Sequence, residues 1–414
     1  MKKLFAILLS VLMLLSVCAC GKKTTPATTG GQTATEKNPE NEGPDLTATE
    51  DDKAKLEALY TGLQPHHGQL HDHAKTGPRS DGNNTLSEWL ENMPGVGMEY
   101  AAILDHRQTH HMYREEWDPT IFISGSEAMT YIVDRDERYN KYHYNMIFRN
   151  VEDMEAFLKQ YILQYQCGKQ EDHTVFEYLS MQSTKFIEII QSILDSGGYF
   201  VIPHPSSTAP ELSPDPMEYY FCDFIGYEVF YYFNKDWPTR IAKTRENYAI
   251  WTGMLANDKR VYVSAGCDQH KLPTNLALST VYSDQKLDTS YIDQLRKGNY
   301  TAGPVGIRMC IGDTMMGGTG TFAGQRVVVS VSDFHGDHAD PSHTYRVDVV
   351  TDTGVVYSQN VVPGETNYIA FDADENAKFY RIELHDENLE ATEFDPDFTL
   401  LALGNPIWNE AFYE

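Results

Sequence analysis

Nine side chains of the types that bind metal ions are spread through the first two thirds of the chain. They are His71, His73, Asp81, His106, Glu127, His143, His204, Asp268 and His270. Neutral imidazoles mixed with carboxylates suit Zn²⁺, Mn²⁺ or Fe²⁺. A single histidine on an apolar segment is more often a satisfied core residue, so only the complete set indicates a metal site. The set predicts chemistry assisted by divalent cations.

Most of these residues fall where a short apolar run ends. The runs close as GQLHDH, YAAILDH, IFISGSE, YFVIPH and VYVSAGCDQH, whereas His143 opens the run HYNMIF. In barrels of alternating strand and helix, side chains at the carboxyl ends of several strands converge on one mouth. The pattern therefore predicts one mouth lined by many metal ligands.

Strand-like and helix-like segments alternate from about residue 56 to 302. A capping box at Thr85 and Glu88 opens one predicted helix, and further helices are predicted over 151–166, 184–195 and 239–257. This alternation favours parallel strands with helical crossovers, in a barrel or an open α/β sheet. From 303 to 414, short runs alternate apolar and polar residues, which predicts a β-sandwich domain.

The first twenty residues have the features of an export signal. Lys2 and Lys3 precede an apolar stretch that closes as Val17-Cys18-Ala19-Cys20-Gly21. This resembles a bacterial lipoprotein signal, which implies cleavage before Cys20 and acylation of its sulfur. An ordinary secretory signal and a retained anchor are the alternatives. We expect residues 21–55 to be a disordered tether, and the protein to be held at the outer face of the membrane by its lipid alone.

Composition narrows the choice of partners. The 414 residues include 33 Lys and Arg against 60 Asp and Glu, a formal net charge of -27. Such a charge repels phosphate backbones at long range, so we expect no nucleic-acid partner. Bound divalent cations would reverse the sign locally. The expected partner is a small-molecule substrate.

Taken together, the motifs resemble those of the PHP family, the polymerase and histidinol phosphatase domain. In order they read His71-x-His73, Ser80-Asp81-Gly82, Asp105-His106, Gly125-Ser126-Glu127, His143, His204-Pro205 and Gly266-Cys267-Asp268-Gln269-His270. The gap between His73 and Ser80 is longer than in many members. The β-rich C-terminal region and Asn405-Pro406-Ile407-Trp408 are similar to the CehA/McbA-like branch.

The resemblance implies a distorted seven-stranded β/α barrel, TIM-like in type, over 56–302 and followed by the β-sandwich. It implies two or three divalent ions of Zn, Mn or Fe and hydrolysis of a small phosphate ester by a metal-bridging hydroxide. Glu127 and Asp268 would be catalytic, with Glu127 bridging two ions. The ligand sets it implies are His71, His73, Glu127 and Asp268; then Glu127, His143 and His204; then Asp81, His106 and His270.

Several interpretations stay open at this point. The same site would serve a carboxyl ester, carbamate or amide hydrolase, and a non-catalytic ligand-binding lipoprotein is a further alternative. Arg107 follows His106 directly and fits either a phosphate contact or a solvated surface residue. The aromatic run 219–233 fits core packing or a stacking surface. The loop carrying His335, His338 and His343 fits an exposed polar loop better than a second metal loop.

Overall fold

The computed structural model describes most of the chain from Leu46 onward. The described ranges are 46–77, 80–106, 108–133, 139–161, 181–208, 215–231, 238–272, 278–284, 289–389 and 398–413. The predicted signal peptide, its Cys20, most of the predicted tether and Arg107 lie outside them. Within them, no helix has the length and apolar character needed to cross a membrane.

Helices and strands alternate in the first part, and strands dominate after Ala302. The helices are α2 Glu50–Leu59, α3 Leu86–Asn92, α4 Val151–Tyr161, α5 Ser183–Asp195, α6 Pro205–Thr208, α7 Pro238–Ala256 and α8 Thr289–Arg296. Short 3-10 helices are η1 Met93–Val96, η2 His110–Tyr113, η3 Pro216–Tyr219, η4 Gly336–Ala339 and η5 Glu410–Phe412. The strands are β1 Gln64–Asp72, β2 Tyr100–Ile103, β3 Ser124–Val133, β4 Tyr139–Phe148, β5 Met181–Gln182, β6 Tyr199–Ile202, β7 Gly226–Phe230, β8 Tyr262–Ala265, β9 Ser279–Ser283, β10 Tyr300–Ala302, β11 Gly306–Ile311, β12 Thr314–Met315, β13 Thr319–Gly320, β14 Arg326–Ser332, β15 Tyr345–Thr351, β16 Gly354–Val361, β17 Asn367–Asp372, β18 Phe379–Asp386 and β19 Leu400–Asn409.

Two sheets form the first part of the fold. One has the order β5-β3-β4-β6-β7-β8, and the other contains β2, β1, β9 and β10. Isolated parallel bridges connect them: Ala101 with Phe122 and His106 with Glu127 on one side, and Asp72 with Gln269 on the other. The strands β1, β2, β3, β4, β6, β7 and β8 thus follow one another in chain order, with two isolated bridges between β2 and β3 and one between β8 and β1.

The expectation of parallel strands is wrong for β4, which runs antiparallel to both β3 and β6. Only residues 134–138 separate β3 from β4, and a parallel return needs a crossover of a dozen or more residues. The other pairs β1/β2, β6/β7 and β7/β8 are parallel, as expected.

The predicted helices are present, with bounds that differ by one residue in α5 and α7, while residues 162–166 of the helix predicted over 151–166 lie outside the described ranges. Thr85 caps α3 through the expected box, since its backbone N–H donates to Glu88 over 2.7 Å and the Glu88 N–H donates back over 3.3 Å. Buried side chains from these strands and helices form one large core, to which Phe200 of β6 and Trp251 of α7 belong. This core fixes the strand ends that carry the candidate site.

The C-terminal region is β-rich and contains two facing sheets. One has the order β12-β11-β14-β17, and the other is the run β16-β15-β18-β19. Val329 and Ile369 of the first sheet share a core with Val347 and Ile382 of the second, as inward residues of a sandwich do. The second run continues through β19 into β10, β9, β1 and β2, so one sheet crosses the predicted boundary at 302/303.

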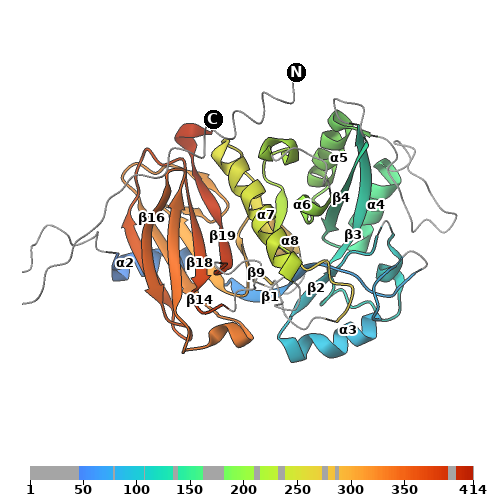
Figure 1. Ribbon diagram of the computed structural model, residues 1–414, viewed down its shortest axis with the longest axis horizontal. Coiled ribbons are helices and arrows are strands. Elements are labelled where there is room, and N and C mark those ends of the chain that lie inside the picture. Colours follow the sequence, from blue (N-terminus) through green and yellow to red (C-terminus); the bar gives the residue numbers. More distant parts are fainter. Residues whose placement is uncertain are drawn as a thin grey trace, which may run out of the picture. The chain divides into compact units, whose positions relative to one another are not determined.

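The predicted tether extends too far, because α2 begins at Glu50, before the predicted end at residue 55. Figure 1 shows α2, in blue, against the orange C-terminal strands. Leu56 is fully buried there, and Asp52 accepts two hydrogen bonds from Arg326 of β14, at 2.9 and 3.0 Å. A capping box between Thr49 and Asp52 starts the helix. The low apolar content of 21–55 hid these few specific contacts.

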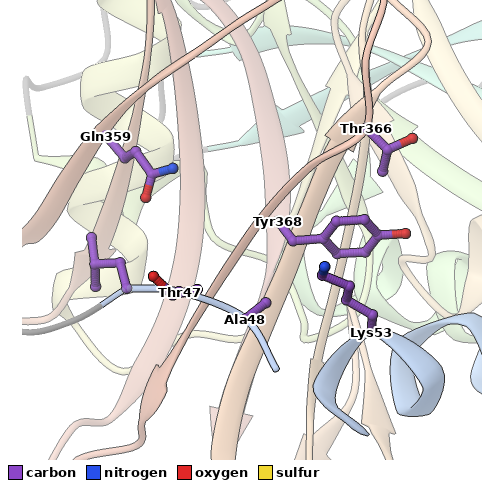
Figure 2. A pocket seen from close by; sticks show the side chains of 7 residues that line it. Thr47, Ala48, Lys53, Gln359, Thr366 and Tyr368 are labelled. Carbon is purple, nitrogen blue, oxygen red and sulfur yellow. The ribbon is translucent and has the colours of Figure 1, made fainter. Parts of the chain in front are cut away.

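A pocket of about 400 Å³ lies beside α2. Figure 2 shows its lining, with the Lys53 ammonium close to the Tyr368 ring, 5.6 Å from the centroid, and Gln359 on the opposite wall. None of the nine candidate ligands lines it. Leu46, the first described residue, is part of its lining. Lys53 is the charged residue among the described lining residues, which include no histidine, cysteine or carboxylate.

Candidate metal centre

All nine predicted site residues lie in one cluster, although they come from seven separate segments. His71 lies in β1, and His73 and Asp81 follow it. His106 follows β2, and His204 follows β6 by two residues. Glu127 and His143 lie within β3 and β4, so Glu127 is near the start of a strand and not at its predicted end. Asp268 and His270 follow β8.

Glu127 lies at the centre of the cluster and faces five imidazoles. Its Oε1 is 2.6 Å from Nδ1 of His143 and 3.3 Å from Nε2 of His204. Its Oε2 is 2.7 Å from Nδ1 of His106, 3.4 Å from Nε2 of His73 and 3.5 Å from Nε2 of His71. The two carboxylate oxygens therefore face two different groups of nitrogen atoms.

Asp268 provides a second carboxylate to the group around His73. Its Oδ1 lies 3.0 Å from Nε2 of His73 and 3.7 Å from Nε2 of His71. Its Oδ2 accepts a hydrogen bond from the Tyr231 hydroxyl over 2.9 Å. One face of Asp268 is thus fixed by protein, and the other faces the cluster.

Asp81 forms the outer end of the cluster. Its Oδ2 lies 3.3 Å from Nε2 of His106 and 3.2 Å from Nε2 of His270. The Asp81 side chain is 51% exposed, whereas Glu127 is fully buried. The cluster therefore runs from a buried carboxylate to one that faces solvent.

Two of these residues have backbone conformations that residues other than glycine rarely adopt. His204 has φ +30° and Asp268 has φ +47°. Such positions cost free energy and are held by their surroundings, which is common at functional sites. Here His204 lies two residues after the end of β6 and Asp268 lies three residues after the end of β8, and both turn toward Glu127.

Opposite charges shift the pKa values of the cluster. Burial alone would raise the pKa of Glu127, but the charges of His143, His106 and His71 outweigh it and hold the pKa well below its usual range. Burial opposes charge on His106, yet Glu127 and Asp81 raise the pKa of this histidine to about 10. Burial also opposes charge on Asp81, but hydrogen bonds and charge from His106 and His270 hold the pKa of this carboxyl low. In the metal-free protein, these charge interactions favour a protonated His106 beside the ionised carboxylates of Glu127 and Asp81.

The donor set fits divalent cations. Oε2 of Glu127 is buried and makes no hydrogen bond to any described residue, although three imidazole nitrogens lie within 3.5 Å of it. Imidazole nitrogens that give up their protons, together with a carboxylate oxygen, are ligands that suit a divalent cation. In each of three groups, the ligand atoms lie within 4.8 Å of one another: His71, His73, Glu127 and Asp268; then His73, Asp81, His106 and His270; then His106, Glu127 and His143.

The first of these groups has the same members as the first implied ligand set, and the second contains the third implied set with His73 added. In the second implied set, His143 and His204 both face Oε1 of Glu127. The third group, however, joins His143 and Glu127 to His106 and not to His204.

The sequence did not indicate two residues that contact the candidate ligands. Glu228 lies in β7 and is 1% exposed, with Oε1 3.2 Å from Nδ1 of His71. Tyr231 follows the same strand and contacts Asp268. A glutamate inside the otherwise apolar run GYEVF was the available signal for the first. Tyr231 had no such signal, because it was one aromatic residue among many.

Asp105 lies beneath the cluster, as a neighbour of the ligands and not among them. It accepts hydrogen bonds from the Thr76 hydroxyl and, over 2.9 Å, from the Ala74 backbone. Its carboxylate is 4.0 Å from Nδ1 of His73 and 3.7 Å from Nδ1 of His111. Burial raises the pKa of Asp105 to about 6 against these hydrogen bonds.

Apart from Tyr231, the other sequence candidates for which the structure describes contacts are not brought to the cluster. In the aromatic run, Tyr219, Tyr227 and Phe230 are buried core residues, while 232–233 lie outside the described ranges. In the loop near η4, His335 contacts the Gly97 carbonyl and His343 contacts Asp386. These histidines form no metal-binding group among the described residues.

Comparisons with known proteins give distant likenesses. No family model and no curated protein matches the sequence. Among solved structures, a two-domain protein from Bacteroides vulgatus containing a predicted PHP-like metal-dependent phosphoesterase is 13% identical, with a TM-score of 0.36 over 90% of this chain and 100% of that chain. A CARDB domain from Pyrococcus furiosus in complex with di-metal ions is 13% identical, with a TM-score of 0.18 over 26% of this chain and 93% of that chain. An engineered protein is 11% identical, with a TM-score of 0.16 over 62% and 70%. All three TM-scores are low, so these likenesses assign neither a fold nor an activity to this chain.

Proposed function

We propose that this chain is a PHP-type metal-dependent phosphoesterase that hydrolyses a small phosphate ester. The observation that carries the proposal is the position of Glu127, whose two oxygens face five imidazoles in a buried cluster. A shared carboxylate of this kind lets two cations approach closely. The nearly continuous ring of seven strands supports a distorted PHP-type barrel as part of the same proposal.

The chain's own residues would bind and orient the cations and the substrate. His71, His73 and Asp268 would hold one ion with Glu127, while His143 and His204 lie on the other oxygen of Glu127. When bound, two such ions make water nucleophilic near neutral pH and offset negative charge in the transition state. Burial of Glu127 strengthens every charge interaction there.

The outer group favours a phosphate ester among the possible substrates. Asp81, His106 and His270 form a third set of ligand atoms at the exposed end, so a tetrahedral phosphoryl group would meet cation-binding residues on two sides. Asp81 would hold its ion where the substrate enters. A planar carboxyl ester has one carbonyl oxygen to polarise and does not need this third set.

One observation favours the second candidate, a carboxyl ester, carbamate or amide hydrolase. Within the part of the chain that the structure describes, the cluster carboxylates form ion pairs with histidines and not with lysine or arginine. A phosphate site without such cations depends on its metals for all positive charge.

The lipid anchor at Cys20 and export to the outer face of the membrane are separate proposals that rest on the sequence alone.

Metal content and hydrolysis together test the proposal. The full chain, purified in detergent, is loaded with Zn²⁺ or Mn²⁺ and assayed with p-nitrophenyl phosphate, a nucleoside bisphosphate, and an aryl ester or carbamate. Two or three ions per chain with phosphate release are expected. His204→Ala should abolish release, whereas His343→Ala, a histidine that also contacts a carboxylate, should not.

Each other outcome decides between the candidates. Cleavage of the ester or carbamate alone would favour the second candidate function. A chain that binds no metal under these conditions would contradict both hydrolase candidates.

A further inference from the structure

Glu228 contacts two candidate ligands at once from beneath the cluster. It lies in the middle of β7 and is 1% exposed. Its Oε1 is 3.2 Å from Nδ1 of His71, and its Oε2 accepts the backbone N–H of His204 over 2.8 Å. A buried carboxylate needs such donors, because burying its charge without hydrogen-bond partners is unfavourable.

The contact with His71 fixes which ring nitrogen faces the cluster. A carboxylate accepts only, so Nδ1 of His71 must carry the proton in this pair. Nε2 then presents its lone pair to the cluster, where it lies 3.5 Å from Oε2 of Glu127 and 3.7 Å from Oδ1 of Asp268. A histidine can bind a cation only through the nitrogen that has no proton.

The contact with His204 holds a strained turn. His204 has φ +30°, and its backbone N–H points to Oε2 of Glu228. This turn brings Nε2 of the His204 ring to 3.3 Å from Oε1 of Glu127. The second oxygen of Glu228 therefore stabilises the backbone that aims a different imidazole at the other side of Glu127.

A third segment leaves room for this carboxylate. A Cβ atom on Gly266 would lie 2.2 Å from Oε1 of Glu228 and 2.7 Å from Cβ of His71. Glycine is therefore required where the chain turns toward Asp268 and His270. Glu228 thus adjoins three segments that carry candidate ligands: His71 in β1, the turn at His204 after β6, and Gly266 before Asp268 and His270.

We propose that Glu228 is a positioning residue that sets the tautomer of His71 and the turn at His204, and so prepares the site for its cations. The inference rests on the proposed metal-dependent function and extends it to a residue that motif analysis did not indicate. Glu228 acts through His71 and His204 and need not touch a cation or the substrate.

Glu228→Gln tests this role with almost no change in shape. A glutamine has one oxygen and one NH₂ group, so it can accept from only one of the two donors. If its oxygen accepts the His204 N–H, its NH₂ donates to Nδ1 of His71 and moves the ring proton to Nε2. If it turns over, its NH₂ opposes the His204 N–H. Either orientation disturbs one ligand.

The measurement is Zn²⁺ affinity of the full chain in detergent, by competition with a chromophoric chelator. We expect Glu228→Gln to weaken the tightest site by about 10-fold to 100-fold, as is typical for a group that orients a metal ligand. Glu383→Gln is the matched control, because this buried glutamate contacts Tyr248 and Arg381 and none of the nine ligands. It should leave the affinity unchanged.

A double-mutant cycle separates positioning from general stability. If Glu228 acts through His71, its substitution should cost clearly less affinity in a His71→Ala background than in the unmutated chain, whereas a merely structural role would give additive losses. The melting temperature of each metal-free variant checks folding. Glu228→Asp, which reaches only one donor, is the second variant if Glu228→Gln does not fold, and it should lose affinity in the same direction.

The outcomes distinguish this inference from the function on which it rests. An unmutated chain without Zn²⁺ affinity would contradict the proposed function itself. An unmutated chain that binds Zn²⁺ no more tightly than Glu228→Gln would contradict the positioning role alone. Additive losses, or two Glu228 variants that both fail to fold, would make Glu228 a structural residue and overturn the inference.

Discussion

The hydroxyl of Tyr231 donates a hydrogen bond to Oδ2 of Asp268 over 2.9 Å, while Oδ1 of the same carboxylate faces His73 at 3.0 Å. Asp268 also has a positive φ of 47°. The phenol therefore fixes the rotation of a carboxylate whose backbone is strained, and it directs the remaining oxygen into the cluster.

Tyr231→Phe should weaken metal binding by about tenfold, because it removes a hydrogen bond to a charged group but keeps the ring packed on His204. Zn²⁺ competition against a chelator measures the change. Tyr227→Phe is the matched control, since that hydroxyl donates to the Tyr219 carbonyl. Equal affinity in Tyr231→Phe and the unmutated chain would mean that Asp268 orients itself.

Substitution of the two ends of the cluster should give different metal stoichiometries. Glu127→Gln should remove the ions of the two inner groups, because this buried carboxylate is common to both. Asp81→Asn should lose about one ion and keep the rest, since Asp81 forms ion pairs with His106 and His270 and with no other candidate ligand in the described part of the chain. Elemental analysis of the dialysed proteins measures both. Equal losses would show that the outer group is not a separate site.

The metal-free protein should lose stability as the pH falls from 6.5 to 4, in part through His67. Burial, helped by nearby His335, lowers the pKa of His67 to about 4. The unfolded chain takes up this proton near pH 6.5, whereas the folded chain takes it up only near pH 4. Protonation therefore favours unfolding as the pH falls through this window, and this group has no effect above it.

The His67 contribution is on the order of 3 kcal/mol across the window, at about 1.4 kcal/mol for each pKa unit. His67→Asn removes the ionisable ring and keeps a polar atom near Thr280, whose hydroxyl lies 3.0 Å from Nδ1 of His67. Melting temperatures in EDTA, taken every half pH unit, measure the slope. We expect a shallower slope in His67→Asn, and an identical slope would rule out His67 as the cause.

Much of the cluster could be predicted because its residues end or follow strands whose apolar runs are visible in the sequence. His204 and Asp268 lie two and three residues after the ends of β6 and β8, so the strand pattern alone places them at one edge. Glu228 and Tyr231 could not be predicted in the same way. Their roles depend on which strands are neighbours, and a sequence pattern with period two does not give strand order.

The errors in the fold have physical causes of the same kind. The antiparallel β4 follows from a connection too short for a helix, a feature of loop length that strand and helix propensities do not report. The folded segment from Leu46 to Leu59 depends on Leu56 and on Arg326, which lies far along the chain. Long-range partners of this type are invisible in composition.

The segment before β1 should contribute to stability and not to catalysis. Leu56 of α2 is fully buried against the C-terminal sheet. Leu56→Ala should therefore cost about 2 to 5 kcal/mol and lower the melting temperature, with unchanged metal content. The control is Lys55→Ala on the same helix, whose ion pair with Asp313 is exposed and contributes little. An unchanged melting temperature in Leu56→Ala would mean that α2 is not docked in solution.

Substitution of Asn405 should strongly lower the stability of the fold, because its side chain joins β19 to two other strands. Its side-chain oxygen accepts the Val263 N–H over 2.8 Å, and its NH₂ donates to the carbonyls of Gly298 and Tyr300 over 3.1 and 3.2 Å. The residue is fully buried. Asn405→Leu removes the side-chain partner of three backbone groups, and a buried polar group that loses its partner costs about 1 to 3 kcal/mol.

We therefore expect Asn405→Leu to lower the free energy of unfolding by about 3 kcal/mol or more, measured by denaturant titration. The exposed Asn360→Leu on β16 should change it by about 0.5 kcal/mol or less. Similar losses in the two variants would contradict the role of Asn405 as a bridge between strands. Since Val263 lies in β8, five residues before Asp268, loosening of this bridge should also lower Zn²⁺ affinity, in contrast to Leu56→Ala.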